Sequence, residues 1–273
     1  MEFRASRLFD IRPRDNSTSP TQGRHGVDTR IACAIMPKWA KKWQGEFMSA
    51  VSDNRQAPFW HHKHSGEQRW PVTAVVLIVI LLQLTLPSSL NIKFPVFICG
   101  IELVLLVLIT AMNPKRINEH LPTPRTLGLI LAALMTISNL VSTGRLITAL
   151  MHGGVTDANR LVFSGGSIWF TNVVVFALWY WEFDRGGPGA RAQARHQVPD
   201  FMFPQMSDPD LAAPQWASKF FDYLYISFTN ASAFSPTDVL PLTRWAKALM
   251  LVQSVTSLVV VALVIARGVN ILH

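Results

Sequence analysis

The sequence predicts an all-α, polytopic transmembrane helical bundle, with about five spanning helices and one half-helix before the last span. Hydrophobic residues make up 49% of the 273-residue chain and charged residues only 15%, against about 25% charged residues in ordinary globular domains. The charges are bunched, which leaves uncharged segments of about 20 residues, the length that a helix needs to cross a bilayer. These observations indicate an integral membrane protein.

Residues 1–69 are interpreted as a basic, largely disordered N-terminal region. They hold 12 of the 25 Lys and Arg residues and contain no apolar core of a secretory signal. Within them, residues 37–51 could form a short helix on an anionic membrane surface or be only weakly helical. His61, His62 and His64 are read as a solvated stretch, because zinc ligands have to converge tetrahedrally. No metal site and no cofactor are expected.

Four spans are predicted in region 70–182. Their ranges are Pro71–Leu86, Phe94–Met112, Thr126–Met151 and Leu161–Trp181. The first lies in a charge-free gap between Arg69 and Lys93, and the fourth ends in three aromatic residues that are typical of a membrane interface. A polar loop follows over residues 183–215, and its FDRGGP segment indicates a turn.

The last region, residues 216–273, is the stretch on which the functional hypothesis rests. It comprises a half-helix over Trp216–Ser232, a Ser/Thr/Pro turn and a final span over Ala248–Ala266. A helix that stops at a turn and restarts as a full-length apolar helix suggests a re-entrant segment. Backbone can stop inside a membrane only where protein or a water-filled cavity satisfies its polar groups, as in pores and transport sites.

The order of residues in this region resembles the pore-loop and inner-helix unit of two-transmembrane potassium channels. Residues 227–229 (SFT) correspond to the pore helix, residues 232–237 to the filter, Asp238 to its closing Asp and residues 239–243 (VLPLT) to the exit. Ser235 and Thr237 replace both filter glycines, and Pro236 stands at the Tyr position. The resemblance therefore implies the pore architecture without potassium selectivity, since glycines let the filter backbone adopt φ > 0.

A second resemblance covers about residues 70–272, including WYWEFDRGGP and SFTNASAFSPTD. This part is similar to an uncharacterised family of bacterial integral membrane proteins. That resemblance implies no established activity.

Two charged residues, Glu102 and Arg145, lie inside predicted spans. Glu102 is about 12 Å along its helix from Phe94, and Arg145 is about 10 Å from His152 on the same side of the membrane. Because consecutive spans are often antiparallel neighbours, we predict an intramembrane ion pair that clamps them. The alternatives are a polar cavity in which Glu102 binds a cation or a proton, and an unpaired arrangement. Asn139 and Asn172 are expected to form hydrogen bonds between helices.

Basic residues concentrate in regions 1–69, 113–125 and 182–215, with one each in the two opposing loops. The positive-inside rule therefore predicts a multi-pass protein of the cell membrane with a cytoplasmic N-terminus. A potassium-channel unit requires the opposite orientation of its pore loop, so the side of the C-terminus stays open. The basic residues are read as topology and not as a nucleic-acid surface.

Two functions fit these patterns. The first is a cation channel-like or transport protein, a homo-oligomer in the lipid bilayer that conducts a small cation. Its polar pathway would be lined by Thr229, Asn230, Ser232, Ser235, Thr237 and Asp238, although these residues also suit a capped turn. The second is a non-conducting membrane scaffold or assembly factor. An enzyme is not expected, because the sequence has no HExxH or GxSxG motif and its spans hold too few carboxylates for a catalytic pair.

Overall fold

The computed structural model describes residues 59–87, 89–91, 95–112, 115–117, 122–152, 157–195, 198–208, 212–233 and 238–272, all within one compact unit. Segment 1–58, with the helix expected over residues 37–51, lies outside the described residues. So do Ser235 and Thr237 of the expected polar pathway.

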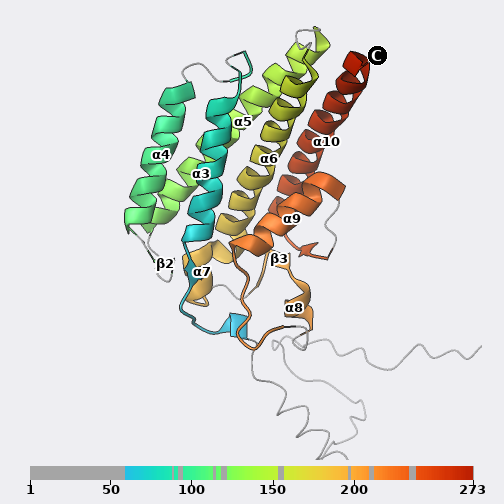
Figure 1. The fold of residues 1–273 in the computed structure, drawn as a ribbon. Helices are drawn as coiled ribbons and strands as arrows, with labels where there is room; N and C mark the ends of the chain where they lie inside the picture. Colours follow the sequence, from blue (N-terminus) through green and yellow to red (C-terminus); the bar gives the residue numbers. More distant parts are fainter. Residues whose placement is uncertain are drawn as a thin grey trace, which may run out of the picture. The chain divides into compact units, whose positions relative to one another are not determined.

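In the described part of the chain, five long helices form the bundle, and the fold class is the predicted all-α helical bundle (Figure 1). They are α3 (Trp70–Thr85), α4 (Pro95–Met112), α5 (Pro122–Met151), α6 (Ala158–Phe183) and α10 (Arg244–Leu272). Of the helices in the described ranges, α4, α5, α6 and α10 are long and apolar enough to cross a membrane. Helix α3 is equally apolar but has only 16 residues, about 24 Å of helix.

Helix α6 is the central element of the bundle, because it packs against α5, α9 and α10. Small residues in its first half allow α10 to come close. A Cβ atom added at Gly165 would lie only 2.5 Å from Val264 Cγ2 of α10. Such small residues let two helix backbones approach each other in a membrane, where apolar burial gives little drive for association.

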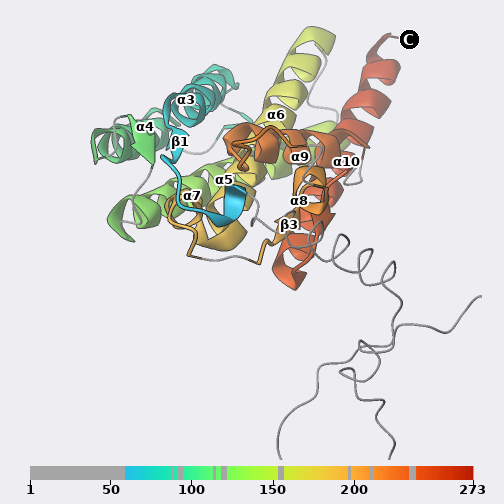
Figure 2. The same cartoon turned by 90° about the horizontal axis from the view of Figure 1, so that it is seen from below.

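Helix α9 (Phe220–Ala233) has 14 residues, about 21 Å, and lies across α6 and beside α10, as the view from below shows (Figure 2). The chain on both sides of α9 meets at one end of the bundle. There β4 (Leu240–Pro241) pairs antiparallel with β3 (Phe201–Met202), and the Leu242 N–H donates to the Asp200 carbonyl at 2.8 Å. The half-helix thus starts and returns at the same end, which is the path expected of a re-entrant segment.

The lower end of the bundle in Figure 1 is closed by a folded region that we call the cap. Its elements are η1 (Phe59–His61), β1 (Glu67–Gln68), β2 (Arg116–Ile117), η2 (Asp184–Gly186), α7 (Pro188–Ala192), β3, α8 (Pro204–Ser207) and β4. β1 and β2 pair antiparallel, with Glu67 opposite Ile117.

The cap corrects the prediction of a polar loop over residues 183–215. The FDRGGP turn is present, with φ of 50° at Arg185, 80° at Gly186 and 95° at Gly187. Several of the described residues that follow it, among them Ala190, Arg191, Phe201 and Phe203, are buried, although others such as Val198 and Asp208 are exposed. Phe201 is fully buried, and its ring lies 5.1 Å from that of Tyr180. Polar composition misled the prediction because the charged side chains here are buried together.

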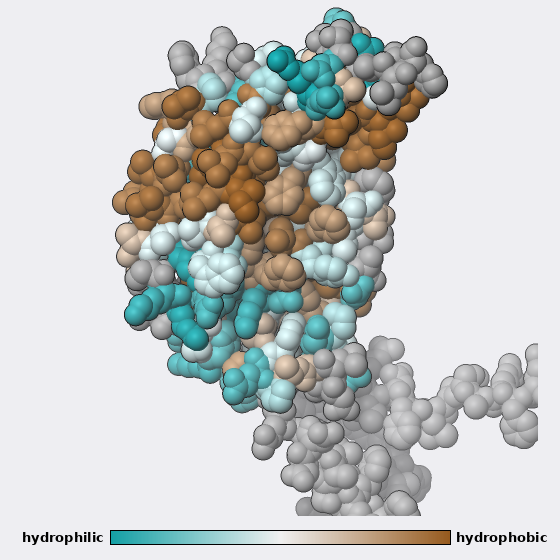
Figure 3. Space-filling view, viewed as in Figure 1, coloured by the Kyte–Doolittle hydropathy of each residue, from teal (hydrophilic) through white to brown (hydrophobic). Residues whose placement is uncertain are grey.

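Hydropathy divides the surface on the face that Figure 3 shows. Hydrophobic side chains gather over the bundle, and hydrophilic ones gather at the cap below them and at the opposite end above them. Large apolar side chains such as Leu81 of α3, Val104 of α4 and Leu251 of α10 are more than half exposed. Long helices with exposed apolar faces are compatible with insertion in a membrane.

Candidate functional site

The residues expected to line a polar pathway do not converge among those that the structure describes. Asn230 is buried and faces α10, where its Nδ2 donates to the Met250 carbonyl and to Gln253 Oε1, both at 2.9 Å. Thr229 and Ser232 donate to carbonyls of their own helix. Asp238, beyond the undescribed residues 234–237, is exposed.

Asn230 belongs to a polar network that holds α9 against α6 and α10. Gln253, fully buried in α10, donates to the Ser227 carbonyl at 2.9 Å and accepts from the Tyr180 hydroxyl at 2.6 Å. Ser227 in turn donates to the Val173 carbonyl of α6 at 2.5 Å. These bonds satisfy polar groups of a half-helix inside the bundle.

Asn172 takes the role predicted for it, since its Nδ2 donates to Ser257 Oγ of α10 at 2.9 Å. Sequence reasoning missed Gln253. A signal existed, because Gln253 and Ser257 are four residues apart in an uncharged run and therefore share a helix face.

The predicted ion pair between Glu102 and Arg145 is not formed in the described structure. Arg145 Nη1 donates to the Asn91 carbonyl in the α3–α4 connection, and Glu102 Oε1 accepts from Ser138 Oγ at 3.5 Å. Ser138 lies seven residues before Arg145 in α5, about 10 Å along the helix. The two charges therefore lie at different depths, because α5 has 30 residues and α4 only 18.

Buried charges gather in the cap. The Asp184 carboxylate accepts from the Asp200 N–H at 2.8 Å and from the Tyr223 hydroxyl at 2.5 Å. It also lies 3.5 Å from Nε of Arg185, which is buried as well. Arg185 Nη2 donates to Ser218 Oγ at 2.9 Å. This ion pair ties the turn after α6 to β3 and to the start of α9.

Arg191 of α7 is a second buried cation in the cap, only 3% exposed. Its Nη1 donates to the carbonyls of Trp181 at 2.6 Å and of Asp184 at 2.9 Å, and its guanidinium lies 4.9 Å from the ring centroid of Tyr223. Its Nη2 is buried without a hydrogen-bond partner.

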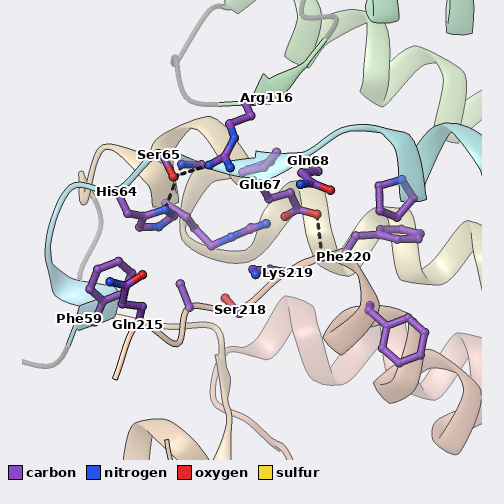
Figure 4. Close-up of a pocket in the computed structure, with 16 residues that line it drawn as sticks. Phe59, His64, Ser65, Glu67, Gln68, Arg116, Gln215, Ser218, Lys219 and Phe220 are labelled. Carbon is purple, nitrogen blue, oxygen red and sulfur yellow. Dashed lines mark hydrogen bonds between the residues drawn. The ribbon is translucent and has the colours of Figure 1, made fainter. Parts of the chain in front are cut away.

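Next to Arg191 the cap contains a pocket of about 430 Å³, which we call the cap pocket (Figure 4). It lies between β1, α7 and the start of α9. Its polar and charged lining residues are His64, Ser65, Glu67, Gln68, Arg116, Arg191, Gln215, Ser218 and Lys219. Arg116 donates to Ser65 Oγ at 2.5 Å across the pocket mouth.

Glu67, the carboxylate in the pocket lining, already has two donors. Its Oε1 accepts from the Phe220 N–H at 2.8 Å and its Oε2 from Trp181 Nε1 at 2.9 Å. Burial nevertheless raises the pKa of Glu67, and the nearby Arg191 and the two hydrogen bonds offset only part of that effect. The pocket therefore has three cationic side chains and one carboxylate whose oxygens are occupied.

His64 lies at the pocket beside these cations. Burial, followed by the positive charges of Arg185, Arg191 and Lys219, lowers the pKa of His64. The ring is therefore neutral near pH 7, and its Nδ1 accepts from the Gly66 N–H at 3.2 Å. The structure thus assigns the positive charge of the pocket to its arginine and lysine residues.

Within the described ranges, no group of three or more His, Cys, Asp or Glu side chains could hold a metal ion. Comparisons with protein-family models, with curated proteins and with solved structures gave no match to this chain. The cap pocket could not be predicted from the sequence, because its lining comes from four segments that are far apart along the chain.

Proposed function

We propose that the protein is a multi-pass protein of the cell membrane that binds an anionic, phosphate-bearing ligand in the cap pocket. The observation that carries the proposal is the charge of the pocket, in which Arg116, Arg191 and Lys219 face one carboxylate, Glu67. Arginine and lysine are the side chains that best recognise phosphate groups in proteins.

The exposure of the pocket lining also supports a ligand that approaches from water. The exposed Lys219 and Arg116 leave room for a ligand to approach from water, while Phe221, 73% exposed, lies at the same pocket. The ligand could therefore be a phospholipid headgroup or a soluble phosphate compound.

The orientation is part of the proposal. Most of the basic residues of the described chain that flank the spans lie in or near the cap, including Lys115, Arg116, Arg125, Arg191 and Lys219. The positive-inside rule favours a cytoplasmic cap and N-terminus. Because α10 starts at the cap and runs away from it, the C-terminus would lie on the opposite side of the membrane.

The test is binding by the purified protein in nanodiscs of zwitterionic lipid. One arm titrates inorganic phosphate, and the other compares discs with and without an anionic phospholipid. Thermal stabilisation reports binding, since a ligand that binds only the folded state raises its stability. Whichever of the two ligands stabilises the wild type should fail to stabilise the double variant Arg116→Gln/Lys219→Gln.

The matched control is Arg160→Gln, which removes an exposed cation at the other end of the bundle. It should respond as the wild type does. Equal stabilisation of the wild type and the double variant, or no stabilisation in either arm, would refute the proposal. A response to phosphate alone identifies a soluble ligand, and a response to the lipid alone identifies a headgroup.

Cation conduction is a second candidate, favoured by the path of α9, which starts and returns at the same end of the bundle. One such segment cannot enclose a pore, so the conducting form would be a homo-oligomer. Liposomes that contain the protein should then pass small cations, and Asp238→Asn should change the flux. No flux for several ions, together with stable association with another protein, would favour the scaffold.

A further inference from the structure

A second polar cluster lies away from the cap pocket, between α3, α4 and α5. At its centre is Glu102, which is fully buried. Gln83 of α3 lies against its carboxyl group, and Ser138 of α5 donates to its Oε1 at 3.5 Å. Glu102 Oε2 and Gln83 Nε2 are both buried without a hydrogen-bond partner.

The charged and titratable groups on the helices around Glu102 do not neutralise it. Helix α4 packs against α3 and α5, and α3 has no charged residue. On α5, Arg125 lies near the cap, beside Gly187, and Arg145 donates to the Asn91 carbonyl. Cys99, one turn before Glu102, donates to Gln83 Oε1 at 3.8 Å. No described cation therefore contacts Glu102, and an ionised carboxylate without a partner is disfavoured in such a place.

We infer that Glu102 is a proton-binding site inside the bundle. A carboxylate oxygen takes up one proton, an O–H bond forms, and the side chain becomes a neutral carboxylic acid; release reverses this step. The Gln83 amide has both a donor and an acceptor, so it can serve the carboxyl group in either state.

Further polar contacts lie between the end of α3 and one end of the bundle. Asn91 Nδ2 donates to the Gln83 carbonyl at 2.6 Å, and the half-exposed Arg145 contacts the Asn91 carbonyl. The α3–α4 connection lies at the end opposite the cap (Figure 1). These polar contacts of the α3–α4 connection therefore lie on the side of the bundle that faces away from the cap. This inference is independent of the phosphate site.

The test is labelling with a hydrophobic carbodiimide, a reagent that modifies protonated carboxyl groups in apolar surroundings. The intact protein in detergent micelles is treated at a series of pH values, and its peptides are analysed by mass spectrometry. Glu102 should be modified at acid and neutral pH, and the label should decline as the pH rises. Excess sodium or potassium should not protect it.

Infrared difference spectroscopy gives a second measurement. Glu102→Gln should remove one carbonyl-stretch component of a protonated carboxylic acid, whereas Asp157→Asn, which changes an exposed carboxylate, should leave every such component in place. The inference is overturned if Glu102 stays unlabelled and Glu102→Gln leaves the infrared band unchanged. Protection of Glu102 by an alkali cation would also overturn it, because the site would then hold that cation.

Discussion

Gly165→Ala tests whether α6 and α10 are held at a distance that only glycine permits. The new Cβ would lie 2.5 Å from Val264 Cγ2 and 3.3 Å from Val264 Cγ1. A valine in a helix has essentially one side-chain rotamer, so it cannot turn away and the helices must separate. Such overpacking costs about 1–3 kcal/mol, and the better helix propensity of alanine offsets up to about 1 kcal/mol of this. We expect a net loss of about 0–2 kcal/mol in the free energy of unfolding.

The adjacent glycine supplies a matched control. A Cβ added at Gly166 meets nothing within 4 Å, so Gly166→Ala should be neutral or stabilising by up to about 1 kcal/mol. Thermal unfolding of both variants in one detergent, followed by circular dichroism, measures the difference. Adding Val264→Ala should harm the Gly165→Ala protein less than it harms the wild type, since the two sites are coupled. Equal unfolding midpoints for the two glycine variants would refute the close approach.

Three further predictions concern polar side chains. Asp184→Asn should lower the free energy of unfolding by about 3–5 kcal/mol, because it leaves the buried Arg185 guanidinium without its counter-charge. The control Asp157→Asn, at an exposed ion pair, should lower it by at most about 1 kcal/mol. Asn230→Ala should lower the free energy of unfolding by about 1–3 kcal/mol, because it leaves buried partners on α10 unsatisfied. Thr229→Ala should change it by no more than about 0.5 kcal/mol. Equal losses for the two variants would contradict a polar network that holds α9 in place. Because burial raises the pKa of Glu67, the free energy of unfolding should fall as the pH rises from the pKa of Glu67 in the unfolded chain through its pKa in the folded protein. In unfolding measurements over a series of pH values, Glu67→Gln should make this decline smaller. A wild-type protein whose stability does not fall over this range would contradict the prediction.

The long helices were predictable because uncharged runs of about 20 residues are typical of helices that cross a membrane. The second span was expected at Phe94–Met112 and is found at Pro95–Met112, and the half-helix ends within one residue of its predicted end. The start of α10 was missed. The final span was expected over Ala248–Ala266, but the helix begins at Arg244, and Arg244 and Lys247 form its first turn, where long basic side chains can reach the membrane surface.

The candidate site was far less predictable. The cap pocket depends on β1, α7 and the start of α9 coming together, and nothing in the sequence pairs residues 64–68 with residues 188–191 or 215–221. The error over Glu102 has a different origin. Counting residues from the end of each span assumes that neighbouring helices end at one level, and α5 extends well beyond α4.

The contacts of α9 with both α6 and α10 also bear on the order in which the helices pack during synthesis. Ser227 finds its acceptor on α6, which the ribosome has already completed, but Asn230 finds its partners on α10, which is synthesised later. At about 21 Å, α9 is too short to be retained as a span of its own. Helix α9 can therefore pack on α6 first, but its polar contacts are complete only after the last helix has been made, so the penultimate helix of the chain is the final one to be fully bonded.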